Sequence, residues 1–269
     1  MWHYASMSTP RQVPDDLWGE LEQLLPAAPS HAKGGRNRAN DRTLLDGMLH
    51  VLWTGGAWRA LPRLVFGPWQ TVYDRFAEWK RAGVFEQIWA RCLHLYDRKL
   101  GIEWQWQSAD GTMVRAPAGG KEAGPNPTDR GKPGYKEHLL VDGRGVPLST
   151  VSTAANVNDG PMLPQVLNAL PIVRPQPDRA HPQHLCLDAA FDNAPAREVI
   201  CEERYTGHIA PKGGRAPKGI VHPGGQARRW KVERTHAWHD RFRRLVVNWE
   251  KTLASRYAFI CLANALIAY

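Results

Sequence analysis

The sequence has few cysteines, and none of them form a CxxC pair. Its four cysteines, Cys92, Cys186, Cys201 and Cys261, are spread along 269 residues. A zinc ribbon needs closely spaced cysteine pairs, and a disulfide framework needs more cysteines in a shorter chain. The HxxH pairs at His181 and His236 have a spacing that permits zinc but need a third ligand. We therefore expect reduced, mostly buried thiols and no zinc site.

Long hydrophobic runs are also missing. The longest apolar run, at residues 256–269, is broken by polar residues and is shorter than the roughly 20 residues that span a bilayer. The first residues do not show the basic-then-apolar pattern of a signal peptide. These observations favour a cytoplasmic protein without a membrane partner.

Acidic residues are too few to balance the basic ones. The chain has 35 Lys and Arg residues against 26 Asp and Glu residues, with a net charge of +9 and a pI near 9.6. A surplus of this size favours a polyanionic partner. With no sign of membrane association, nucleic acid is the expected partner.

The first part of the chain is predicted to be mainly helical. Apolar residues recur at helical spacing over residues 15–26, 43–54, 68–83 and 84–101. We expect these residues to form a helical domain at 1–102 that binds DNA. Short helices with a basic surface suit a helix-turn-helix unit, and they suit a plain helical bundle equally well.

From residue 103 the pattern changes to strands separated by helices. Strands are predicted at 104–110, where a turn follows within 111–116, and at 183–188; a hairpin is predicted at 136–154 with its turn at 142–145, and a short strand at 208–212. Helices are predicted at 159–171 and 193–205, followed by a long helix at 228–245. This order predicts an α/β domain with a mixed sheet over residues 103–269.

Two of the predicted strands end in an aspartate, Asp110 and Asp188. Ligands of open α/β sheets gather beyond the carboxyl ends of strands, and carboxylates suit Mg²⁺. Glu233, in the long helix, is a candidate third acid for a site that clamps a phosphodiester with two ions. The alternatives are ordinary ones: an aspartate that caps a helix or forms a turn, and a glutamate that moderates repulsion on a solvated face.

Helical spacing divides the segment 228–245 into two faces. One face carries the charged residues and one histidine: Arg229, Glu233, His236, Asp240 and Arg244. The other face carries Ala237, Trp238, Phe242 and Leu245. We expect this second face to pack on the sheet.

Several long motifs together resemble a known family. These are ADGTMVRA, DRGKPGYKEHLLVDGRGVPLS, AANVNDGPML, CLDAAFDN and RRWKVERTHAWHDRFRRL. In these segments and in their order along the chain, the sequence resembles bacterial insertion-sequence transposases of the IS5 type, within the DDE group. The helical segment before them is similar to the region that precedes the catalytic domain in these proteins. The resemblance covers nearly the whole chain and implies a ribonuclease-H-like catalytic domain.

The resemblance also implies a set of catalytic residues. Asp110 and Asp188 match the two catalytic aspartates, and Glu233 matches the glutamate. Together they would hold Mg²⁺, with Mn²⁺ able to substitute. Asp192 lies four residues after Asp188 and is the alternative second ligand.

The match around the glutamate is incomplete. The family's arginine corresponds to Arg229, four residues before Glu233, but Gln226 stands at the place of its tyrosine. Asp240 stands at the place of its lysine, with Arg241 beside it as a substitute. These departures affect the contacts to phosphate and leave the three acids in place.

The activity that the resemblance implies is cleavage at the ends of an insertion sequence followed by strand transfer into target DNA. The partners would be double-stranded terminal inverted repeats and target DNA, held by a homodimer in the synaptic complex at the bacterial nucleoid. Candidate DNA contacts are Arg229, Arg241, Arg244, Lys33, Arg36, Arg38, Arg42, Arg130, Lys132 and Lys136. The alternatives are a nuclease of the same fold that does not join strands, and a non-catalytic DNA-binding derivative.

Overall fold

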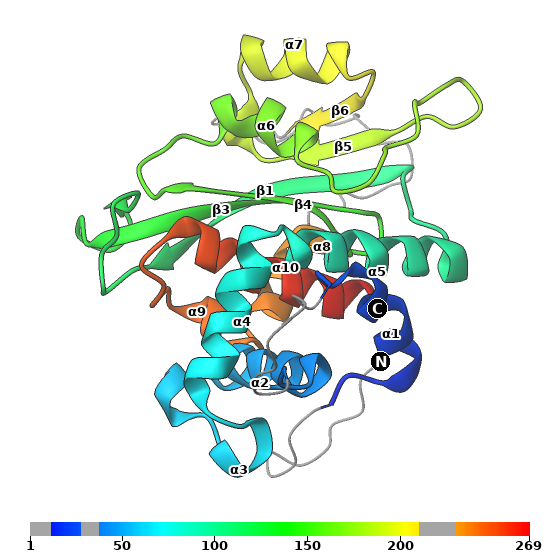
Figure 1. Ribbon diagram of the computed structural model, residues 1–269. Coiled ribbons are helices and arrows are strands. Elements are labelled where there is room, and N and C mark those ends of the chain that lie inside the picture. Colours follow the sequence, from blue (N-terminus) through cyan, green and yellow to red (C-terminus); the bar gives the residue numbers. More distant parts are fainter. Residues whose placement is uncertain (1–11, 28–37, 210–229) are drawn as a thin grey trace.

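The computed structural model describes residues 12–27, 38–209 and 230–269 (Figure 1). The helices before the sheet are α1 (Asp15–Leu21), α2 (Asp41–Thr54), α3 (Arg63–Phe66), α4 (Trp69–Arg81) and α5 (Val84–Leu100). Those after its first strand are α6 (Leu163–Asn168), α7 (Ala194–Glu202), α8 (Trp230–His239), α9 (Arg243–Val246) and α10 (Leu253–Ala268). The strands are β1 (Trp106–Arg115), β2 (Gly124–Pro125), β3 (Pro133–Val141), β4 (Pro147–Ala154), β5 (His184–Leu187) and β6 (Thr206–Ile209).

The strands form one mixed sheet. Its main strands lie in the order β4-β3-β1-β5-β6, and the short β2 pairs with the beginning of β3. β3 runs antiparallel to β1 and β4, whereas β5 is parallel to β1 and to β6. This order, with an antiparallel second strand, is that of a ribonuclease-H-like sheet. The expected fold class is therefore confirmed.

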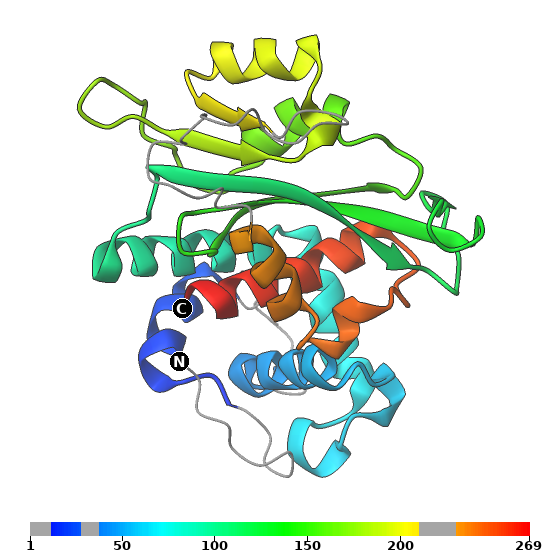
Figure 2. The ribbon, with the colours of Figure 1, turned by 180° about the vertical axis from the view of Figure 1, so that it is seen from behind.

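Helices cover both faces of the sheet (Figures 1 and 2). α6 and α7 lie on one face, and α5, α8 and α10 lie on the other, with α2, α4 and α9 beneath them. The predicted N-terminal helices are confirmed. Asn40 caps α2 by accepting a hydrogen bond from the Thr43 N–H at 3.0 Å, and Gly55 ends it with a φ of 68°.

The C-terminal apolar run forms α10, a helix that the sequence analysis did not predict. α10 is buried along most of its length and packs against α5 and β4. The main hydrophobic cluster runs without interruption from α2 and α4 through α10 to the sheet. The division into domains 1–102 and 103–269 stays a prediction, because the two parts share this core. Within the described residues, no helix is long and apolar enough to cross a membrane.

The predicted long helix at 228–245 is wrong in its length and in its packing face. α8 ends at His239 and α9 begins at Arg243, because Phe242 leaves the helical conformation (φ −87°, ψ 92°) and packs on Trp53 of α2, with 4.4 Å between the ring centroids. Val232 and His239 are buried, whereas Ala237, expected on the sheet, is exposed. After α8 the chain therefore packs on the N-terminal helices through Phe242 and α9, and Val247 then bridges to Arg115 of β1.

A buried ion pair ties α10 to the sheet. The Arg256 Nε donates a hydrogen bond to the Glu137 carboxylate of β3, and its Nη2 donates to the Leu245 carbonyl at 2.9 Å. Arg256 is only 1% exposed. A charge buried this deeply is tolerated because the opposite charge and a carbonyl meet it.

We predict that Arg256→Met lowers the free energy of unfolding by about 3–5 kcal/mol, because it leaves the Glu137 carboxylate buried without a counter-charge. Urea unfolding of the full chain measures this loss. The matched control is Arg98→Met: Arg98 pairs with Glu20 at 3.5 Å, and its side chain is 63% exposed. We expect a loss of less than about 1 kcal/mol there. Equal losses in both variants would contradict the prediction.

Candidate active site

The pairing of β1 with β5 brings the two predicted aspartates together. In this parallel pair, Ser108 lies opposite Cys186. Asp110 and Asp188 each follow two residues later. They therefore lie level with each other, on the same face of the sheet as Ser108 and Cys186. Because neighbouring strands are about 4.8 Å apart, Asp110 and Asp188 are neighbours across the β1–β5 pair.

Local hydrogen bonds orient both aspartates. Asp188 caps a short 3-10 turn, Ala189–Phe191, by accepting a hydrogen bond from the Ala190 N–H to its Oδ1 at 2.9 Å. Asp110 accepts one from the Gly111 N–H to Oδ1, also at 2.9 Å. The capping role anticipated for a strand-end aspartate is thus real at Asp188. It uses one carboxylate oxygen and is compatible with a ligand role for the other. The predicted strand end at Asp110 is wrong, because β1 continues to Arg115 through its pairing with β3.

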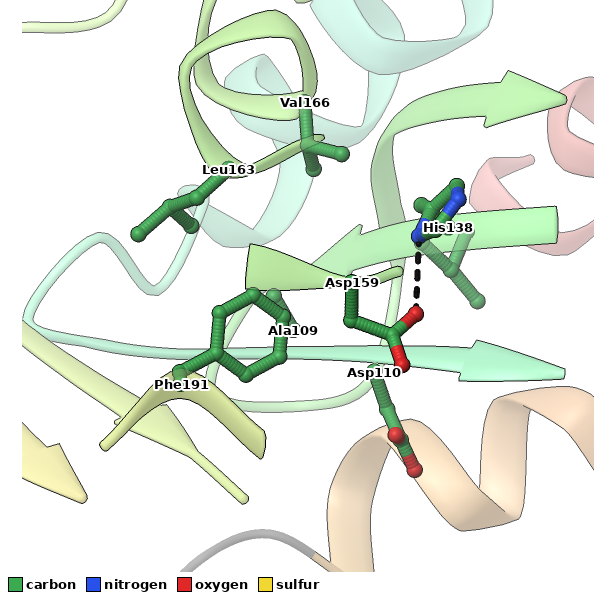
Figure 3. A pocket seen from close by; sticks show the side chains of 8 residues that line it. Ala109, Asp110, His138, Asp159, Leu163, Val166 and Phe191 are labelled. Carbon is green, nitrogen blue, oxygen red and sulfur yellow. Dashed lines mark ion pairs between the residues drawn. The ribbon is translucent and has the colours of Figure 1, made fainter. Parts of the chain in front are cut away.

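α8 places Glu233 over the face that carries Asp110. Val232 of α8 packs with Leu139 and Val141 of β3, and Leu139 lies directly opposite Asp110 in the β1–β3 register. The Asp110 carboxylate is turned toward the ribbon of α8 (Figure 3). Glu233 follows Val232 and is exposed to solvent. Glu233 and Asp110 therefore lie on the same side of the sheet.

These acids fit a divalent cation in chemistry and partly in arrangement. Their carboxylate oxygens are the ligands that Mg²⁺ and Mn²⁺ prefer. The two aspartates are adjacent, and Glu233 lies on the helix that faces them. Among the residues that the structure describes, no three His, Cys, Asp or Glu side chains are close enough together to hold a metal ion.

Asp192, the alternative second ligand, is engaged elsewhere. Its Oδ1 accepts a hydrogen bond from the Arg197 guanidinium of α7 at 2.6 Å. Asp188, in contrast, is the residue level with Asp110 in the β1–β5 register. The geometry favours Asp188 as the second acid.

A further carboxylate, Asp159, lies close to Asp110, and the sequence analysis did not single it out. Its Oδ2 is 3.1 Å from the Lys136 ammonium, and its Oδ1 is 3.2 Å from Nδ1 of His138. Burial would raise the pKa of Asp159, but His138 and Lys136 hold it below its ordinary value. Asp110, Asp159 and His138 line a pocket of about 10 Å³, the size of about one water molecule (Figure 3). The only sequence signal was the position of Asp159 within the motif AANVNDGPML.

Gly111 makes room for Asp159. A Cβ at Gly111 would lie 2.6 Å from Oδ1 of Asp159 and 3.2 Å from Cδ of Lys136. Both distances are shorter than ordinary van der Waals contact. The carboxylate of Asp159 therefore rests against the backbone of β1, at the residue that follows Asp110.

Four of the predicted DNA contacts are engaged within the protein. Arg38 pairs with Glu78 at 2.9 Å, and Arg42 pairs with Asp15 at 2.5 Å. Lys136 is buried against Asp159, as described above. Arg244 is buried too: its Nε donates to Glu250 at 2.9 Å and its Nη1 to the Gly56 carbonyl at 3.2 Å. These contacts favour structural roles for the four cations.

The other six predicted DNA contacts are either exposed or outside the described residues. Arg130, Lys132 and Arg241 are exposed. Lys33, Arg36 and Arg229 lie outside the described residues. Exposure is what a phosphate contact requires, so the first three stay the strongest candidates.

The histidines of α8 are packing groups. His239 is buried, and its Nε2 hydrogen-bonds to Oδ1 of Asn264 at 2.7 Å. His236 is largely covered: burial, with the nearby His239, lowers its pKa to about 4, against an opposing effect of Glu137. At neutral pH, His236 is therefore uncharged and adds no positive charge beside Glu233.

We predict that Gly111→Ala destabilises the protein by about 1–3 kcal/mol, because the new methyl group overlaps the Asp159 carboxylate. Urea unfolding measures the change. Gly19→Ala in α1 is the control, since a Cβ there meets nothing within 4 Å and alanine favours a helix. A Gly111→Ala variant as stable as the wild type would show that Asp159 is not held against β1.

Family models match two parts of the chain. Residues 13–89 match the family described as "Putative transposase of IS4/5 family", and residues 107–268 match "Transposase DDE domain". The second match alone covers more than half of the chain.

Two curated relatives come from Burkholderia cepacia. The chain is 35% identical over 156 residues to "Putative transposase for insertion sequence element IS402", across 56% of this chain and 70% of that protein. It is 32% identical over 118 residues to "Insertion element IS402 uncharacterized 16.2 kDa protein", across 43% of this chain and 80% of that protein. Among solved structures, "Crystal structure of the Mos1 Strand Transfer Complex" covers 86% of this chain and 72% of that chain at 13% identity. Its TM-score is 0.31, too low to support any conclusion.

Proposed function

The chain belongs to the IS4/5 family of DDE transposases, and we propose that it cuts the ends of its own insertion sequence and joins them to target DNA. The observation that carries the proposal is the register of β1 and β5, which places Asp110 and Asp188 opposite each other on adjacent parallel strands. α8 bears Glu233 over the same face. Enzymes of this family use divalent metal ions. Here the ion is Mg²⁺, with Mn²⁺ able to substitute, and its ligands are Asp110, Asp188 and Glu233.

Both steps are in-line displacements at phosphorus and need no covalent enzyme intermediate. When bound, divalent cations would lower the pKa of the attacking water or hydroxyl and offset the charge on the leaving oxygen. The protein's part is to supply carboxylates on one face of the sheet, two from neighbouring strands and one from the helix packed on that face. Arg241, exposed just beyond the end of α8, is placed to offset negative charge on the phosphate.

The basic surface binds the DNA backbone. Arg130 and Lys132 are exposed in the loop between β2 and β3. Contacts of this kind set the register of the duplex and carry no sequence information. Because two DNA ends must be held at once, the working form is a homodimer acting in the cytoplasm at the nucleoid.

We predict that Asp110→Asn, Asp188→Asn and Glu233→Gln each abolish cleavage of end DNA while binding of that DNA persists. An amide keeps the shape of the side chain, and at Asp188 it keeps the capping oxygen, but it supplies a poorer metal ligand. Gel assays of cleavage and of binding measure the two effects. Asp178→Asn, in an exposed loop, is the control and should cleave normally. Normal cleavage by any of the three variants would remove that residue from the site.

One assay separates this function from its alternatives. The wild-type chain is mixed with labelled terminal-repeat DNA, a plasmid and Mg²⁺ or Mn²⁺. Label joined to the plasmid supports a transposase. Cutting without joining would favour a nuclease, and binding without cutting would favour a non-catalytic derivative.

We predict that DNA binding weakens steeply with salt, and that the triple variant Arg130→Ala, Lys132→Ala, Arg241→Ala reduces this dependence. The slope of log affinity against log salt should fall by about 0.9 for each phosphate that the variant no longer neutralises. Fluorescence anisotropy over a salt series measures it. Lys99→Ala, an exposed cation at the end of α5, is the control. An unchanged slope in the triple variant would place the DNA elsewhere.

A further inference from the structure

We infer that Asp159 is a positioning residue for the active site: it neutralises Lys136 directly behind Asp110 and so preserves the site's affinity for a divalent cation. This inference rests on the proposed function, because it concerns the same acids. Asp159 acts through its neighbours, and no contact with substrate is assigned to it.

The first support is the contact geometry. Asp159 follows β4 at the start of a 3-10 turn, Gly160–Met162, and its two oxygens meet Lys136 and His138 at 3.1 and 3.2 Å. Lys136 and His138 are two residues apart on β3, so their side chains share one face of the sheet. His138 is also held at its Nε2 by Thr153 of β4 at 3.0 Å. Asp159, Lys136 and His138 thus form one cluster, with two members on β3 and Asp159 in the loop that follows β4.

The second support is the place of this cluster relative to Asp110. His138 lies opposite Gly111 in the β1–β3 register, and Leu139 lies opposite Asp110. Because side chains alternate along a strand, the cluster is on one face and the Asp110 carboxylate is on the other. The space left by Gly111 lets the Asp159 carboxylate and the Lys136 chain rest on the β1 backbone. Only the thickness of the sheet separates the cluster from the acids.

The third support is burial. The side chains of Lys136 and His138 are 10% and 3% exposed, and that of Asp159 is 21% exposed. A buried ammonium without a counter-charge is costly. Its field is also poorly screened inside a protein, so it opposes the arrival of a second cation nearby. The lowered pKa of Asp159 means that the carboxylate is ionised at neutral pH and cancels that field.

Charge removal tests the inference. We expect Asp159→Asn to weaken Mn²⁺ binding to the DNA-free full chain by about tenfold, because Lys136 is then uncompensated. Isothermal titration calorimetry measures binding, and the Mn²⁺ concentration for half-maximal cleavage should rise in parallel. The double variant Lys136→Met, Asp159→Asn removes both charges and should return both values to within about threefold of the wild type.

The control is Asp178→Asn. Asp178 pairs with His181 at the same distance of 3.2 Å, but in an exposed loop, and its loss should leave Mn²⁺ binding unchanged. Should Asp159→Asn fail to fold, Lys136→Met alone is the second test. It removes the cation and keeps the carboxylate, so Mn²⁺ should bind at least as tightly as in the wild type.

Several results would overturn the inference. These are wild-type Mn²⁺ binding in Asp159→Asn, a double variant as weak as Asp159→Asn, or weakened binding in Lys136→Met. A wild-type chain that binds no Mn²⁺ would overturn it as well. A wild-type chain that binds Mn²⁺ but cuts no end DNA would contradict the proposed function, and the binding series would still decide the role of Asp159.

Discussion

The parallel pairing of β1 with β5 is the constraint on which the candidate site depends. It aligns Ser108 with Cys186 and, through them, Asp110 with Asp188. A shift of one residue would turn one of the two acids to the opposite face, because side chains alternate along a strand. β5 has only four residues. Its register is nevertheless well determined, since it is paired on both sides, with β1 and with β6.

The C-terminal helices place Glu233, the third acid, on the face of the sheet that carries Asp110. α8 lies on β1 and β3, while Phe242 and Arg244 draw the following residues back to the N-terminal helices. α10 then fills the space between these helices and the sheet, with Arg256 on Glu137. The orientation of Glu233 thus depends on packing contributed by residues before the first strand. The N-terminal helical region therefore supports the position of α8 through packing. This role is separate from its predicted role in DNA binding.

Charge in this protein is divided between an internal and an external set. Arg38, Arg42, Lys136 and Arg244 serve ion pairs within the fold, whereas Arg130, Lys132 and Arg241 face solvent. Each of the four internal cations is paired with an acid, so these pairs add nothing to the net charge of +9. Among the internal cations, Lys136 also matters for the proposed site, because it and Asp159 together determine the electrostatic field behind Asp110.

Local pattern in the sequence determined the helices α2, α4 and α5, the position of Asp188 at the end of β5, and the hairpin turn before Val146. These features depend on residues close together in the chain, so periodicity and turn chemistry are enough to predict them. Local pattern did not place Asp110 correctly, because β1 continues through Asp110 to Arg115 by pairing with β3. Only the tertiary structure decided that α8 ends before Phe242, that Lys136 is internal and that Asp159 stands behind Asp110. Each of these depends on a contact between segments far apart in the sequence, such as Trp53 with Phe242. Helical spacing carries no information about such partners, and packing against them outweighed the local preference for one continuous helix.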